Sequence, residues 1–116
     1  MENENVIVIK SFAFALKIIE YSEQLEENKK YVIARQILKA GTSIGANVRE
    51  AQSAESKADF IHKLKIADKE ANELEYWLQL CKLTETYPDP ASLENDLLEI
   101  KKILSKIIST SKAASK

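Results

Sequence analysis

Residues that break helices are almost absent from this sequence. Its 116 residues include only two glycines and two prolines, and both prolines lie within Pro88-Asp89-Pro90. Ala, Leu, Ile, Lys and Glu dominate the remainder, and most of these residues favour helices. Long uninterrupted helices are therefore the expected secondary structure. The length predicts a single domain, 1–116, with one hydrophobic core.

Apolar residues recur at helical spacing in four segments. The predicted helices cover about 5–27, 28–54, 57–85 and 90–110. Asn28 is a candidate cap for the second helix, Ser56 and Asp59 resemble a capping box before the third, and Asp89-Pro90 marks the start of the fourth. The tail 109–116 has no apolar anchor beyond alanine and is expected to fray. Short connections between long helices predict an all-α protein, an antiparallel up-down-up-down four-helix bundle.

Two glycines lie inside the second predicted helix. Gly41 and Gly45 each cost roughly 1 kcal/mol relative to alanine in a helix interior. The helical phase of Ile37, Ile44 and Val48 nevertheless continues through them, whereas a turn would reset it. We therefore predict one continuous helix, with the glycines thinning it so that another backbone packs closely.

The first predicted helix carries two apolar stripes, although a bundle core requires only one. The first stripe comprises Ile9, Phe12, Leu16 and Ile19. The second comprises Ile7, Phe14, Ile18, Tyr21 and Leu25. An exposed stripe of this size would mark an interface, so self-association is expected. The predicted interface residues are Phe14, Ile18, Tyr21 and Leu25.

The net charge of −1 conceals blocks of alternating sign. Segments 1–28, 29–69, 70–99 and 100–116 carry −4, +5, −7 and +5, respectively. Either neighbouring helices attract along their edges, or a basic face binds an anionic partner such as RNA or DNA. The acidic first residues, the single cysteine and the lack of a bilayer-length apolar run favour a cytoplasmic protein without membrane association.

The search for reactive residues indicates no enzyme. Asp59-x-x-His62 resembles half of a di-iron carboxylate site, but His62 is the only histidine and is expected on the surface. Cys81 is expected to be a buried, unreactive thiol. No phosphate loop or metal spacing occurs, and we predict no catalytic residue, cofactor, metal or small-molecule substrate.

A polar stripe accompanies the glycines of the second helix. Ser43, Asn47 and Glu50 share one helix face at i, i+4 and i+7. Glu70, Glu73 and Trp77 form a possible partner stripe on the third helix. Such a set is either a buried hydrogen-bond network or a binding site, and the network is the prediction. Its proposed members are Gln36, Ser43, Asn47, Glu50 and Glu73.

The same stretch resembles the signature of a bacterial family of 23S rRNA intervening-sequence proteins, often labelled as a ribosomal protein. The resemblance rests on Gln36, Ser43-Ile44, Asn47 and Glu50, and it continues through Ser56, Asp59-Phe60, Leu64, Ile66-Ala67 and Glu73-Leu74. Ala51 replaces a usual glycine, and Ala71 stands where serine is common. The resemblance implies a ring-shaped homopentamer with no established enzymatic activity. The sequence is also similar to the accessory protein of diversity-generating retroelements.

Two functions follow from these observations. The first is a non-enzymatic, self-assembling helical bundle that serves as a scaffold or interaction module. The alternative is an accessory factor that binds RNA or DNA through basic faces of the oligomer.

Overall fold

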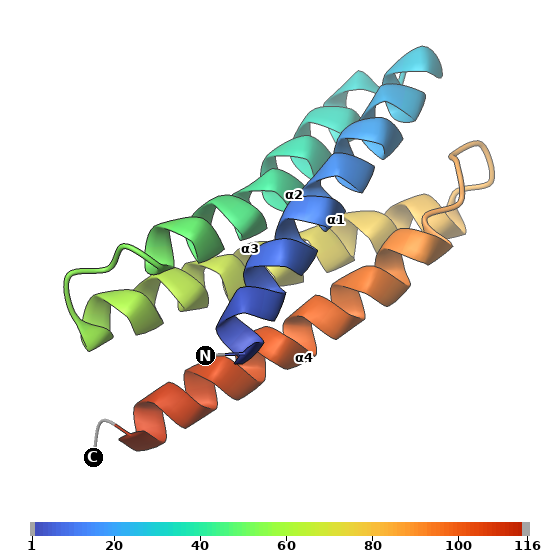
Figure 1. The fold of residues 1–116 in the computed structure, drawn as a ribbon. Coiled ribbons are helices and arrows are strands. Elements are labelled where there is room, and N and C mark those ends of the chain that lie inside the picture. The colour runs from blue at the N-terminus through green and yellow to red at the C-terminus, as the bar shows by residue number, and fades with distance from the viewer. Residues whose placement is uncertain (1, 115–116) are drawn as a thin grey trace.

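In the computed structural model, which describes residues 2–114 and the side chains of residues 6–114, the chain forms four α-helices (Figure 1). They are α1 (Glu2–Glu27), α2 (Tyr31–Ala51), α3 (Lys57–Leu83) and α4 (Ala91–Ala114). No strand occurs within the described range. The prediction of an all-α, four-helix protein is confirmed.

The helices surround one core. α2 packs against α1 and α3, and α4 packs against α3 and α1, so each helix has two neighbours. The molecule measures 49 × 21 × 19 Å, and its longest dimension follows the general direction of the helices (Figure 1). One cluster of buried apolar side chains draws on all four helices. Ile18, Ile44, Leu74 and Leu104 are examples with no exposed surface.

The turn between α1 and α2 differs from the prediction. Asn28 does not cap α2, because α1 ends there in a Schellman motif. The Lys30 amide donates to the Leu25 carbonyl at 2.8 Å, and the Lys29 amide donates to the Glu26 carbonyl at 2.9 Å. Lys29 has a φ of 63°, the left-handed conformation that this motif requires. α2 therefore begins at Tyr31 and ends at Ala51, inside its predicted bounds.

The predicted starts of the last two helices are close to those observed. The Ser56 hydroxyl accepts a hydrogen bond from the Asp59 amide at 3.0 Å. The Asp89 carboxylate accepts one from the Ala91 amide at 3.1 Å. The Tyr21 hydroxyl then ties the α3–α4 connection to α1 by donating to the Pro88 carbonyl at 2.6 Å.

The ends of α3 and α4 need correction. α3 stops at Leu83, two residues before the predicted end, and α4 continues to Ala114. Fraying was predicted from residue 109, yet residues 109–114 are helical because Lys112, Ala113 and Ala114 favour helices and no glycine or proline intervenes. Residues 115–116 lie outside the described range.

α2 runs unbroken through its two glycines, as predicted. Both face α1. A Cβ atom added at Gly41 would lie 2.7 Å from Cγ1 of Ile18, and one at Gly45 would lie 3.3 Å from the backbone oxygen of Ser11. The two helices therefore approach each other so closely that side chains larger than hydrogen do not fit at these positions without rearrangement.

Ion pairs link neighbouring helices at their solvent edges. On α1, Lys10 and Lys17 pair with acids of α4, although α1 lies in a net acidic segment. The side of the helix on which a residue lies therefore decides its ion-pair partner, and the net charge of its sequence segment does not. Among the side chains of residues 6–114, the remaining interhelical pairs are Lys63–Glu50, Lys82–Glu94 and Lys101–Glu75. Each exposed pair contributes about 0–1 kcal/mol, so they supplement the core.

We predict that Gly41→Ala lowers the free energy of unfolding by about 1–3 kcal/mol, the usual cost of overpacking a core. The new methyl group would collide with Ile18, and this outweighs the gain of roughly 1 kcal/mol in helix propensity. Urea denaturation measures the change.

The control is the same substitution in an Ile18→Ala background. With the large side chain removed, Gly41→Ala should be neutral or stabilising. An equal penalty in both backgrounds would show that the collision with Ile18 is not its source.

Candidate interaction surface

Residues of the proposed polar network lie along the edge where α2 meets α3. Asn47 donates its side-chain N–H to the Ser43 backbone carbonyl at 2.9 Å. The Glu50 carboxylate pairs with Lys63 of α3 at 3.0 Å. These contacts do not connect with one another, and Glu50 is exposed. The predicted network is therefore wrong, because the side chains meet a backbone carbonyl and a solvent-edge lysine instead of each other.

Glu73 lies on α3 and contacts Glu70 of its own helix. Partial burial and the hydrogen bond with Glu73 raise the pKa of the Glu70 carboxyl, while Lys39 and Lys69 oppose the shift. Gln36, the remaining predicted member, is half-buried. The two carboxyl groups contact each other, but they form no pair of nucleophile and base.

The second apolar stripe of α1 lies inside the bundle, which corrects the predicted interface. Ile18 and Leu25 have no exposed surface, and Phe14 and Tyr21 are only 2% and 5% exposed. They line the core that α1 shares with its neighbours. None is therefore available to a second subunit without unfolding α1.

The other stripe of α1 is the exposed one. Ile9, Phe12, Leu16 and Ile19 are 69%, 54%, 51% and 41% exposed, and we call them the outer α1 face. At 100° per residue they lie almost opposite the buried stripe, so α1 is apolar on two sides. A contiguous exposed stripe of large apolar residues is typical of an interaction site.

A groove borders the outer α1 face on the side of α2. It has a volume of about 280 Å³. Small residues, including Ser11, Ala15, Gly45 and Ala46, line it. Phe12 lies at its edge beneath Arg49, whose guanidinium carbon is 5.4 Å from the ring centroid. The glycine that allows close packing of the two helices thus also helps to shape this surface.

The small residues of α1 are a sequence signal for its orientation. Next to the buried stripe, on the side that faces α2, α1 carries the small residues Ser11, Ala15 and Ser22. Ser11 and Ser22 are themselves buried. Small residues at this spacing allow helices to approach closely, as the glycines of α2 do. Matching the small side of α1 to the glycine side of α2 would have placed Phe14 and Ile18 in the core.

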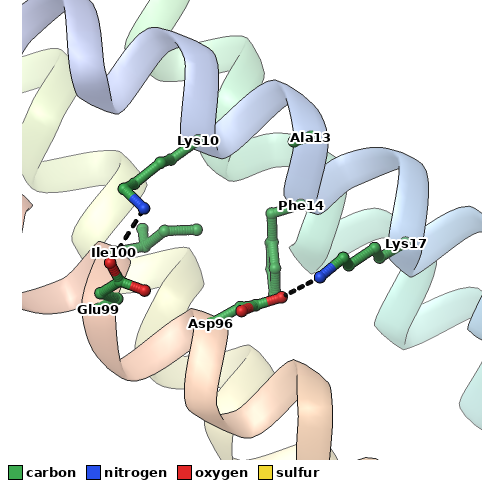
Figure 2. A pocket seen from close by; sticks show the side chains of 7 residues that line it. All are labelled: Lys10, Ala13, Phe14, Lys17, Asp96, Glu99 and Ile100. Atoms are coloured by element: carbon green, nitrogen blue, oxygen red, sulfur yellow. Dashed lines mark hydrogen bonds and ion pairs between the residues drawn. The ribbon is translucent and has the colours of Figure 1, made fainter.

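A second pocket, of about 160 Å³, lies between α1 and α4 (Figure 2). Lys10 pairs with Glu99 at 2.9 Å, and Lys17 pairs with Asp96 at 2.7 Å, so the ion pairs bridge the two helices over Phe14 (Figure 2). The charges of the pocket are already neutralised. This arrangement joins α1 to α4 and offers no free group for chemistry.

The remaining reactive residues have the environments expected of them. Cys81 is 1% exposed, and burial raises the pKa of its thiol although the adjacent Tyr21 hydroxyl lowers it. His62 lies on the surface. No cluster of three or more possible metal ligands occurs among the described residues. Across that same range no helix combines the length and apolarity needed to cross a membrane.

The fold and surface define a class of small helical-bundle proteins with an exposed apolar face. Residues 3–106 match the family described as 23S rRNA-intervening sequence protein, and the chain belongs to that family. It is similar to a crystal structure from Bacteroides thetaiotaomicron, described as a protein with unknown function from the S23 ribosomal protein family. The two are 50% identical with a TM-score of 0.86, over 92% of this chain and 98% of that chain. No curated protein matches the sequence.

The two stripes of α1 should respond differently to charge. We predict that Phe14→Glu unfolds the protein, because an unpaired buried carboxylate costs several kcal/mol against a total stability of about 5–15 kcal/mol. Phe12→Glu should preserve the fold, since the new side chain lies in water. Thermal unfolding, monitored by circular dichroism, compares the two variants. A folded Phe14→Glu protein would contradict the orientation of α1.

Proposed function

We propose that this protein is a non-enzymatic, self-assembling helical bundle of the cytoplasm that acts as a scaffold or interaction module. The outer α1 face is the single observation that carries the proposal. Its four apolar residues are each at least 41% exposed, and at roughly 25 cal/mol per Å² their burial against another copy would be strongly favourable. The proposed assembly is a homopentameric ring of up-down-up-down bundles, and the ring and its stoichiometry rest on the family resemblance.

The lack of a plausible catalytic group on this surface supports a role in binding. Ser11, Thr42 and Arg49 are the polar residues that line the groove. The Ser11 hydroxyl donates to the Val8 carbonyl at 3.3 Å, and the Thr42 hydroxyl donates to the Leu38 carbonyl at 2.7 Å. The carboxylates of the α1–α4 pocket are held by lysines. A largely apolar surface whose hydroxyl groups bond to their own helices, and whose Arg49 rests on the Phe12 ring, suits protein contacts better than chemistry.

Light scattering coupled to gel filtration tests the assembly. The wild-type protein should elute as an oligomer at micromolar concentration, and Phe12→Glu combined with Leu16→Glu should yield folded monomers of 13.1 kDa. Circular dichroism establishes that the variant remains helical. A wild-type monomer would refute self-assembly, whereas an oligomer of another size would refute only the pentamer.

The second candidate function is binding of RNA or DNA. The supporting observation is a cluster of lysines near the end of α4. Lys65 of α3 lies beside Lys112, and this like charge lowers the pKa of the Lys112 ammonium. Lys102 and Lys106 are exposed on the same helix, and residues 100–116 contain no acid. An oligomer would repeat this cluster in every subunit.

Such binding would rest on phosphate contacts and would weaken steeply with salt. Fluorescence anisotropy with a labelled single-stranded RNA should show affinity that falls at least tenfold between low and physiological salt. Lys106→Glu with Lys112→Glu should abolish it. Lys29→Glu with Lys30→Glu, in the turn between α1 and α2, serves as the matched control. Equal losses in both variants would point to nonspecific charge effects.

A further inference from the structure

The groove beside the outer α1 face has the size of a socket for a side chain. Its volume of about 280 Å³ is just below the range of about 300–1,000 Å³ typical of small-molecule sites. Ser11, Ala15 and Gly45 make it hollow because their side chains are small or absent. It is bounded by Phe12 and Arg49 and is open to solvent along α1 and α2. An apolar side chain presented by a protein partner fits this description.

A second exposed apolar face lies on α3. Tyr76, Leu80 and Leu83 are 57%, 40% and 83% exposed and follow one another at i, i+4 and i+7. They therefore form one stripe, which we call the outer α3 face. α3 does not pack against α1 within the bundle, so the two outer faces belong to non-adjacent helices. A single subunit cannot cover one face with the other.

The charges beside the two faces are complementary. Arg49 forms no ion pair with any carboxylate whose side chain the structure describes, and its guanidinium rests on the Phe12 ring. On α3, Glu85 is exposed just beyond Leu83, and Glu73 is exposed near Tyr76, where its carboxyl contacts that of Glu70. Neither carboxylate forms an ion pair among the described side chains. An unpaired cation at the groove and unpaired anions at the α3 face favour their association and disfavour contact of either face with itself.

We infer that the outer α3 face of one copy docks into the α1–α2 groove of the next copy, so that subunits associate head to tail. This inference rests on the self-assembly proposed above and names the two surfaces that form each contact. Leu80 and Leu83 enter the groove, and Arg49 faces the acidic residues of α3. A contact between two different faces is heterologous and repeats from copy to copy, whereas a symmetric dimer through the outer α1 face would leave the outer α3 face uncovered.

Two variants separate the halves of the contact. Ala46→Phe fills the groove from an exposed position and leaves α3 intact. Leu80→Glu with Leu83→Glu removes the apolar side chains of the outer α3 face and leaves the groove intact. The matched controls are Ala113→Phe, at an exposed alanine of α4, and Val32→Glu, at a valine that is 67% exposed. Circular dichroism verifies that every variant is folded.

Light scattering then reports the assembly of each protein. Each interface variant alone should be monomeric, and both controls should assemble like the wild type. Equal amounts of the two interface variants should combine into a heterodimer of twice 13.1 kDa, because together they retain one intact groove and one intact α3 face. A concentration series of the mixture gives the affinity of this single contact.

The other outcomes overturn the inference in distinguishable ways. If the α3 variant assembles like the wild type, α3 is not part of the contact, although self-assembly stands. If both variants are monomeric but do not combine, the two faces do not bind each other. If the wild-type protein is itself monomeric, the proposed function fails together with the inference.

Discussion

The close approach of α1 and α2 is the constraint on which the remaining arrangement depends. At Gly41 the space for a side chain is occupied by Ile18, and at Gly45 the backbone of Ser11 lies where a methyl group would be crowded. Only one side of α1 is flat enough to meet α2 in this way, because that side carries the small residues Ser11, Ala15 and Ser22. Because that side borders Phe14 and Ile18, these residues enter the core and the opposite stripe is left in water.

This orientation of α1 also explains where the binding surface lies. A helix that is apolar on two sides has to leave one of them outside a monomeric bundle. Here the ion pairs of Lys10 and Lys17 with α4 stabilise the observed orientation of α1 at its other edge. The groove then arises because glycine and alanine of α2 meet serine and alanine of α1. Packing and surface are thus two consequences of the same small residues.

The family signature has a different meaning in the structure from the one its polar residues suggest. Asn47 makes a local bond to the Ser43 carbonyl, and Glu50 makes a salt bridge at the solvent edge. Such contacts contribute modestly to stability, about 0.5–1.5 kcal/mol for a hydrogen bond and less for an exposed ion pair. Gly41 and Gly45, which lie in the same stretch, decide by contrast how α2 meets α1, and with it the position of the core.

The sequence by itself determined the helices and their approximate bounds, because helical periodicity, Asp89-Pro90 and the capping residue Ser56 act locally. It also placed Cys81 in the core and kept α2 continuous. Which stripe of α1 is buried was decided in the tertiary structure, since both stripes are apolar and the choice depends on how the small residues of α1 meet the glycines of α2. The polar network failed for the same reason: a shared helix face places side chains in one direction, but only packing decides whether they meet each other, a backbone carbonyl or a lysine at the edge.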